Sequence, residues 1–272
     1  MIEENKQPFN YKTISYMRKI LQCKELDEDV KMFKLKEGKL NHKFTDKINK
    51  DFRTKFLREN ERLHDDIRRV IEFYCFTQNV NYCQGMIDLL LPFMMMKQQT
   101  TTKQQWVPLA PSLSDSDQQQ QPLLDLSFVY GYFKRFVLLF LPNIIHAKFD
   151  GQTGQNTLPY LRCALNLCEL LLKYHDKELS NHLKKYGLIF EMFASDWLVT
   201  LFTRLVHFNL LYELWEIFLF ERDKYFIFYL AVALLSSARV TILQQQSMEQ
   251  LITFIRSHLR ISSFEVLTTI YQ

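Results

Sequence analysis

Chain-breaking residues are scarce in this sequence. Only 6 Gly and 7 Pro occur in 272 residues, too few for the many tight turns of a sheet-rich fold. Their scarcity favours long helices joined by short connections, so we expect an all-α protein. Hydrophobic residues make up 47% and charged residues 24% of the chain, a balance typical of a globular protein with a sizeable core.

Paired cysteines and long apolar runs are also lacking. The 5 cysteines are scattered and include no C-x-x-C pair, which argues against a disulfide framework or a zinc site and favours reduced thiols. The longest apolar run, Tyr225 to Leu235, is about half of a membrane span. The N-terminus lacks a signal-peptide pattern, and Ile2 excludes myristoylation. We therefore expect a cytoplasmic protein that reaches membranes only through partners.

The charge pattern gives no sign of a nucleic-acid site. The net charge is +4, and residues 1–69 hold 18 Lys and Arg against 13 Asp and Glu, whereas the remainder is near neutral. A mildly basic first quarter suits an acidic protein surface, a nucleic acid or an anionic membrane, and a solvated helical surface explains it more simply. Because no dense basic run with interleaved aromatics occurs, we expect no nucleic-acid partner.

Apolar residues recur at helical spacing along most of the chain. One stripe consists of Leu63, Ile67, Val70, Ile71 and Tyr74. It predicts a helix that an Asp65–Arg69 pair would support. Further helices are expected within residues 11–35, 86–96, 124–141, 158–174, 195–219, 225–242 and 247–270.

Two polar segments interrupt this helical pattern. Residues 97–122 are rich in Gln, Thr, Ser and Pro and contain a run from Gln118 to Gln121. Such a segment buries too little apolar surface to offset its ordering entropy, which predicts a disordered insertion. The stretch from Asp150 to Gly154 is predicted to be a loop and the seam between two packed helical subdomains.

Self-contained catalytic machinery is missing as well. The sequence has no G-x-S-x-G, no H-E-x-x-H and no Rossmann glycine pattern, and its 7 histidines are dispersed. We therefore expect no intrinsic catalysis, no metal and no cofactor of the chain's own.

Tyr82-Cys83-Gln84-Gly85-Met86 resembles the Y-x-Q-G-M signature of TBC domains, which activate Rab-type GTPases. Downstream blocks at 197–204, 214–216 and 226–231 resemble the family's C-terminal motifs in the same order and spacing. The resemblance covers roughly residues 40–240 and implies a TBC-like array of helices. It divides the chain into a diverged helical region at 1–39, a TBC-like domain at 40–242 with the 97–122 insertion, and a C-terminal helix at 243–272.

The resemblance also implies two catalytic side chains that act on a partner's GTP. An arginine stabilises charge on the phosphate oxygens, and an amide orients the attacking water. Gln84 matches the family's glutamine, on a loop that Tyr82 would buttress and in which Gly85 permits close backbone approach. The alternative for Gln84 is that it only caps the next helix.

The arginine motif I-x-x-D-x-x-R is matched out of register. Ile48 and Asp51 fit, but Thr54 stands at the arginine position and Arg53 comes one residue early. Arg53 is the candidate arginine, with Asp51 orienting its segment, although one residue on a helix is a rotation of about 100°. Arg69 also fits the letters, but its place inside the helix, about 12 Å before the Gln84 loop, argues against it.

Two functions are consistent with these residues. The first is a GTPase-activating protein for a Rab-family small GTPase, in which the GTP and Mg²⁺ belong to the partner. The second is a catalytically inactive adaptor that binds a GTPase or a vesicle-tethering protein. The chain looks most similar to the subgroup whose TBC domain precedes a rhodanese-like domain, which implies trafficking at endosome or Golgi membranes. A helical interaction domain without a GTPase partner is a third, less specific interpretation.

Overall fold

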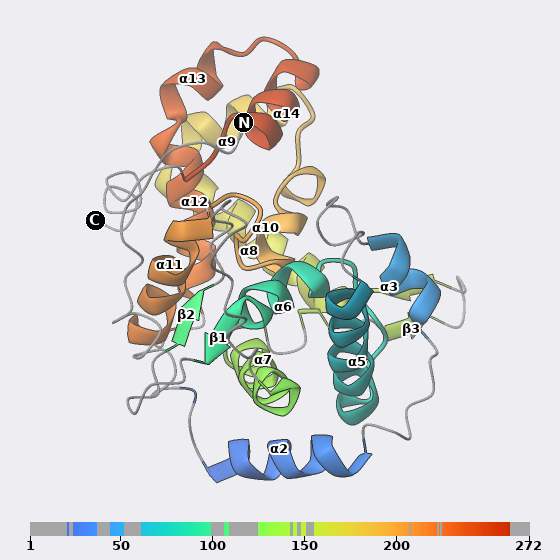
Figure 1. The fold of residues 1–272 in the computed structure, drawn as a ribbon. Coiled ribbons are helices and arrows are strands. Elements are labelled where there is room, and N and C mark those ends of the chain that lie inside the picture. The colour runs from blue at the N-terminus through green and yellow to red at the C-terminus, as the bar shows by residue number, and fades with distance from the viewer. Residues whose placement is uncertain are drawn as a thin grey trace.

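The chain folds into an array of helices, as expected. The computed structural model describes residues 21, 24–36, 44–51, 61–98, 106–108, 125–141, 144–145, 148–150, 155–206, 208–221, 223 and 225–261. Most of these residues are helical, and Figure 1 shows the helices as two groups that lie against each other. The all-α prediction is therefore confirmed.

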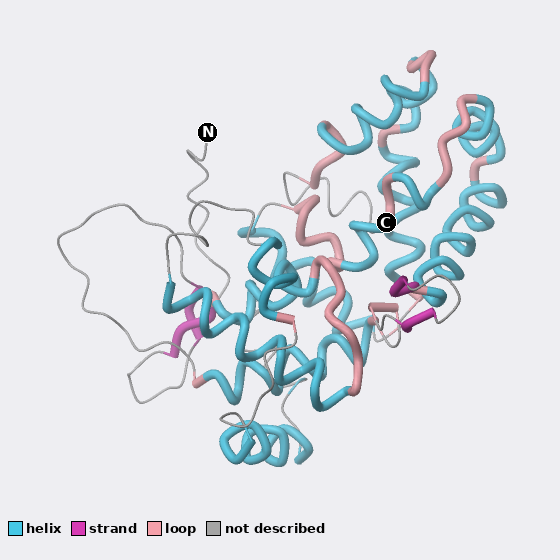
Figure 2. Tube along the Cα trace, turned by 90° about the vertical axis from the view of Figure 1, so that its right-hand side faces the viewer, coloured by secondary structure: helices cyan, strands magenta, loops and turns pink. Residues whose placement is uncertain are grey.

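The first group comprises the described helices before residue 141. They are α2 (Lys24–Lys36), α3 (Thr45–Asp51), α5 (Glu61–Gln78), α6 (Met86–Met94) and α7 (Leu126–Phe140). Helix α5 buries the predicted apolar stripe and packs on α3, α6 and α7. Helix α2 crosses α7 at the lower end of the molecule (Figures 1 and 2), where buried Asp29 accepts a 2.6 Å hydrogen bond from Lys134.

The second group comprises the helices that the structure describes after residue 158. They are α8 (Pro159–His175), α9 (Lys177–Lys185), the 3-10 helix η2 (Phe190–Met192), α10 (Ser195–Val199), α11 (Phe208–Glu221), α12 (Phe226–Ser237), α13 (Arg239–Gln244) and α14 (Met248–Ser257). Helix α8 begins with Pro159, which suits a first helical position. It lies at the centre of the group and contacts α9, α10, η2 and α12.

Two short strand pairs accompany the helices. Strand β1 (Met96–Gln98) pairs antiparallel with β2 (Trp106–Pro108), and β3 (Lys148–Asp150) pairs antiparallel with β4 (Gln155–Thr157). Figure 2 shows the two pairs on opposite sides of the helices. The first pair falls partly within the predicted insertion at 97–122, most of which lies outside the described residues. The second flanks the predicted seam between the subdomains.

An aromatic core joins the two groups. The indole of Trp215 on α11 stacks on Phe93 of α6 with ring centroids 5.5 Å apart, and its centroid lies 4.4 Å from that of Phe136 of α7. Tyr212, one turn earlier, donates a 2.7 Å hydrogen bond to the carbonyl of Pro92. Burying these rings is strongly favourable, so the subdomains share one core instead of docking as separate units.

The expectation of one helix over residues 195–219 is wrong. Helix α10 ends at Val199, and α11 begins only at Phe208. Between them Leu201 and Phe202 have left-handed backbones, with φ of 45° and 64°. The indole of Trp215 donates a 3.2 Å hydrogen bond to the carbonyl of Leu201 and stabilises this turn. An uninterrupted apolar pattern concealed the break because neither residue is a usual helix terminator.

Two other helical expectations need refinement. Residues 225–242 form α12 and α13, separated at Ala238, and α14 ends at Ser257 within the segment expected to continue to 270. Helix α9 was not expected; Asp176 begins it by accepting a 2.9 Å hydrogen bond from the Leu179 amide. Residues 1–20 and 262–272 lie outside the described part, and the boundaries at 39 and 242 stay predictions.

Within the described part of the chain, the helices are too short or too polar to cross a membrane.

Candidate functional site

The candidate site is the loop between α5 and α6, residues 79–85, hereafter the Gln84 loop. Helix α5 ends with Asn79 in the left-handed conformation at φ 51°, and the Val80 amide donates a 3.0 Å hydrogen bond to the carbonyl of Cys75. This is the usual way to satisfy the last carbonyls of a helix, and asparagine tolerates the conformation. The loop therefore leaves α5 in a defined direction.

Tyr82 and Asp51 join the loop to α3. Tyr82 is buried, and its hydroxyl donates a short hydrogen bond to the Asp51 carboxylate. Burial, together with this hydrogen bond and the Asp51 charge, raises the pKa of Tyr82 above its usual range. The phenol therefore stays protonated and remains a donor. The structure thus joins two residues that the sequence analysis assigned to separate supporting roles.

Gly85 presses the loop against the second group of helices. Its φ of 103° favours glycine, and a Cβ built there would lie 2.9 Å from Cγ1 of Val199 and 3.1 Å from Cγ2 of Thr200. Gly85 therefore lies close against α10, and the role expected of it in the approach to a GTPase stays a prediction.

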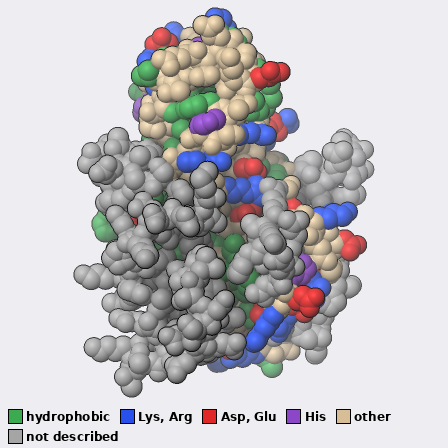
Figure 3. All heavy atoms as spheres, turned by 45° about the horizontal axis from the view of Figure 1, so that its top comes forward, with side chains coloured by type: hydrophobic (Ala, Val, Ile, Leu, Met, Phe, Trp, Pro, Cys, Tyr) green, Lys and Arg blue, Asp and Glu red, His purple; other side chains and the backbone are tan. Residues whose placement is uncertain are grey.

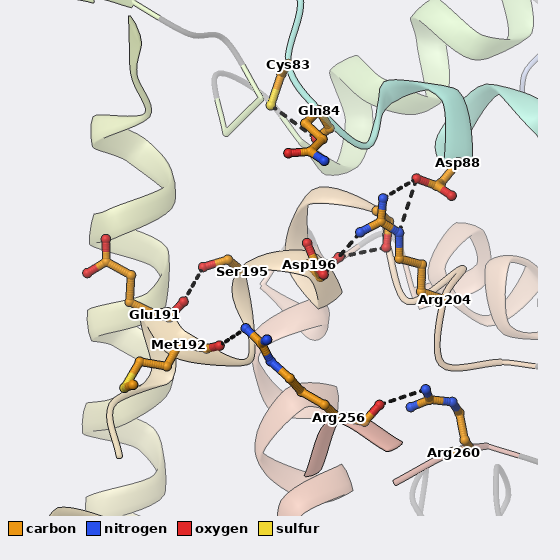
Figure 4. A network of polar contacts seen from close by, with 11 residues as sticks. Cys83, Gln84, Asp88, Glu191, Met192, Ser195, Asp196, Arg204, Arg256 and Arg260 are labelled. Atoms are coloured by element: carbon orange, nitrogen blue, oxygen red, sulfur yellow. Dashed lines mark hydrogen bonds and ion pairs between the residues drawn. The ribbon is translucent and has the colours of Figure 1, made fainter. Parts of the chain in front are cut away.

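A network of three charged side chains lies beside the loop (Figure 4). Nη2 of Arg204 lies 2.6 Å from Oδ2 of Asp88 on α6, and its Nη1 lies 3.1 Å from Oδ2 of Asp196 on α10. Burial alone would lower the pKa of Arg204, but hydrogen bonds and charges from Asp88 and Asp196 raise it. Arg204 is therefore a permanent cation held between two carboxylates.

Gln84 is exposed near the end of this loop, directly before Gly85, and Figure 4 shows its side chain beside the network of Asp88, Asp196 and Arg204. The next helix is capped at Gly85 without a side-chain hydrogen bond. The capping alternative for Gln84 therefore has no support in the geometry. An exposed amide on an anchored loop is suited to bind a group that another molecule brings.

The structure describes only one of the two arginines that were weighed as the catalytic arginine. Arg53 lies outside the described residues, so its role stays a prediction. Arg69 forms a 3.1 Å ion pair with Asp66, while Asp65 pairs with Arg68. The carboxylate partner expected for Arg69 was thus off by one residue, because the ion pairs on α5 have i,i+3 spacing.

Sequence reasoning missed the role of Asp88, Asp196 and Arg204. Asp88 lies two residues after the last residue of the motif, Met86, and Arg204 ends the block 197–204 that supported the resemblance. No sequence signal pairs residues separated by 116 positions. In the described residues, no three His, Cys, Asp or Glu side chains are grouped as metal ligands.

On the face that Figure 3 draws, the described charged side chains are mixed in sign. Figure 3 shows acidic and basic side chains alternating along the described surface below the lobe that carries α13 and α14. Such a surface favours a protein partner with a matching mixture of charges over one attracted by a uniform field.

Comparisons with known proteins agree with the motif. Residues 5–243 match the family model described as the Rab-GTPase-TBC domain. TBC domain-containing protein kinase-like proteins of chicken, mouse and human are each 31% identical over 115 residues, which is 42% of this chain. The match spans only 12% of the length of these relatives.

Solved structures share the fold. The Ypt/Rab-GAP domain of Gyp1p aligns with a TM-score of 0.57 and 17% identity, covering 96% of this chain and 77% of that one. The Chlamydomonas flagellar RabGAP TBC domain aligns with a TM-score of 0.59 and 13% identity, covering 98% and 81%.

Proposed function

The chain belongs to the Rab-GTPase-TBC domain family, and we propose that it is a GTPase-activating protein for a Rab-family small GTPase. The observation that carries this proposal is the exposed Gln84 amide on a loop anchored to both halves of the fold. Anchoring matters because an in-trans catalytic group must already be in place when the partner binds.

The chemistry belongs to the partner's nucleotide pocket. GTP and Mg²⁺ are held by the GTPase, and this chain needs no cofactor of its own. The Gln84 amide carries both a donor and an acceptor, so it can hold a water in line with the γ-phosphate. The chain is therefore an activator and not a self-contained enzyme.

Arg53 is the proposed second group. It follows Asp51 by two residues, and Gln84 follows Tyr82 by two residues. Because Tyr82 and Asp51 are hydrogen-bonded, two short tethers, each about 7 Å when extended, start from one shared anchor. We therefore propose that Arg53 and Gln84 serve one nucleotide pocket, with the contact between their neighbours Asp51 and Tyr82 in support.

The test is stimulated GTP hydrolysis across a broad Rab panel, comparing the wild type with Gln84→Ala. We expect stimulation to fall roughly 10²-fold or more, as when one preorganised catalytic hydrogen-bonding group is removed. The free energy of unfolding should change by less than about 0.5 kcal/mol because Gln84 is exposed. Gln244→Ala, an exposed glutamine at the end of α13, is the matched control. If the wild type stimulates no Rab, the proposal fails.

The register of the arginine motif favours a second candidate, a catalytically inactive adaptor. Thr54 stands where the motif places arginine, and an arginine finger contributes roughly 10³–10⁵ in rate. The adaptor would bind a GTPase or a tethering protein with an affinity that Arg53→Ala leaves unchanged. Strong stimulation that Arg53→Ala abolishes would exclude it. The rhodanese-linked subgroup and a place at endosome or Golgi membranes are finer proposals that rest on sequence resemblance alone.

A further inference from the structure

The contacts of Arg204 with Asp88 and Asp196 join three separate elements. Asp88 lies in the first turn of α6, four residues after Gln84; Asp196 lies in α10; and Arg204 lies in the turn before α11. Nε and Nη2 of Arg204 both donate to Oδ2 of Asp88, at 3.2 and 2.6 Å, while Nη1 is 3.1 Å from Asp196. Every nitrogen of the guanidinium thus has a carboxylate neighbour.

This arrangement is stronger than an ordinary surface ion pair. The Arg204 side chain is only 21% exposed and that of Asp88 33%, so solvent screens the pair less than it screens exposed charges. A planar guanidinium bound through several nitrogens also fixes direction as well as distance. The three residues therefore fix where α6 begins relative to α10.

Backbone strain beside Arg204 supports a positional role. Leu201 and Phe202 adopt left-handed conformations, which are unfavourable for residues with a Cβ. This turn follows α10 and leads to Arg204, which contacts Asp88 of α6. The same segment supplies Val199 and Thr200, which press on Gly85. The start of α6 is thus attached to α10 by packing and by charge.

We propose that Asp88, Arg204 and Asp196 form a clamp that positions the Gln84 loop for the partner's nucleotide. The proposal rests on the proposed function for its catalytic consequence. The three are positioning residues. Arg204 is already bound by two carboxylates, and its effect on catalysis comes from fixing the direction of the Gln84 loop. A displacement of about 1 Å at a catalytic group can lower a rate by roughly 10²-fold.

The first experiment measures stimulated hydrolysis with purified variants on a Rab that responds to the wild type. Arg204→Lys keeps the charge but loses the planar fork, whereas Arg204→Met loses both. We expect each to lower kcat by roughly 10- to 100-fold, with KM for the GTP-loaded Rab within about twofold of the wild type. Asp196→Asn changes the more exposed carboxylate of the clamp and should give a smaller loss of kcat. It replaces the two Arg204 variants as the test if these fold poorly.

A matched control exists elsewhere in the fold. Arg239 on α13 bridges Asp176 and Glu178 in the same manner, and Figure 1 shows α13 at the far end from α6. Arg239→Lys should leave kcat unchanged. In a Gln84→Ala background, Arg204→Lys should produce no further loss of kcat, because the clamp acts only through the loop. Additive losses would overturn the positioning role.

Hydrogen exchange tests the clamp without any GTPase. The amides of Met86 and Leu89 donate to the carbonyls of Cys83 and Gly85, so the peptide covering residues 83–89 reports the order of the loop. Arg204→Lys should speed its exchange at least about tenfold, and Arg239→Lys should not.

The outcomes separate the two proposals. A wild type that stimulates no Rab removes the proposed function, while exchange still decides whether the clamp holds the loop. Unchanged exchange and unchanged kcat in Arg204→Lys overturn the clamp and leave the proposed function intact. If kcat falls in Arg204→Met but not in Arg204→Lys, Arg204 acts by neutralising charge and does not set the direction of the loop, which overturns the clamp.

Discussion

Replacing Gly85 by alanine tests how firmly the Gln84 loop is seated on α10. The new Cβ would lie 2.9 Å from Val199 and 3.1 Å from Thr200, at a φ of 103°. The left-handed backbone costs about 1–2 kcal/mol for a residue with a Cβ, and the overlap with packed neighbours about 1–3 kcal/mol. Together they predict a loss of about 2–5 kcal/mol in the free energy of unfolding, a large share of a typical domain's stability.

Urea denaturation followed by circular dichroism measures this loss. Gly187→Ala is the control, because Gly187 also has a positive φ, 72°, but its added Cβ would meet no atom within 4 Å. It should lose only the backbone contribution of about 1–2 kcal/mol. The double variant Gly85→Ala/Val199→Ala should be less destabilised than the sum of the single changes. Equal losses for the two glycine variants would refute the contact with α10.

Two further substitutions, a pH dependence and a thiol reaction test the loop's attachment and the core. Tyr82→Phe removes the donor to Asp51 and should lower the free energy of unfolding by about 1.5–3 kcal/mol in urea titrations; an unchanged midpoint would contradict this. Trp215→Phe loses the hydrogen bond to the Leu201 carbonyl and part of a fully buried ring. The free energy of unfolding, measured by thermal melting, should therefore fall by at least about 2 kcal/mol. Burial raises the pKa of three thiols to about 12. These thiols are Cys75, Cys83 and Cys168. The folded pKa values of these thiols exceed the unfolded value of about 8.5. Their contribution to the free energy of unfolding should therefore be fully present below about pH 8.5 and should be lost as the pH rises above it. Exposed Cys163 should react with a thiol reagent in the native protein before these three.

The sequence predicted the features that depend on local pattern. The helical stripe on α5 is buried as its spacing requires, and the Y-x-Q-G-M motif located the exposed loop. The end of α5 at Asn79 also follows from local pattern, because the helical spacing stops there and asparagine readily adopts the left-handed conformation. These features follow from residues that are neighbours in the chain.

Features that depend on tertiary contacts could not be predicted. Leu201 and Phe202 look like helix interior, and only the contact with Trp215 explains why the chain turns there. Arg204 lies in a block that reads as ordinary core, and its partner Asp88 is 116 positions away. The functional roles of Gln84 and Arg53 stay predictions, since they depend on a second protein.

The Gln84 loop requires both halves of the fold for one physical reason. A loop that presents an exposed amide cannot bury that amide for stability, so its order must come from the residues around it. Tyr82 supplies an attachment to α3, whereas Gly85 and Asp88 supply attachments to α10 and Arg204. The strained turn that carries Arg204 is itself held by Trp215, whose ring packs between α6 and α7. The shared aromatic core thus stabilises the position of one exposed side chain, which is what a group acting in trans requires.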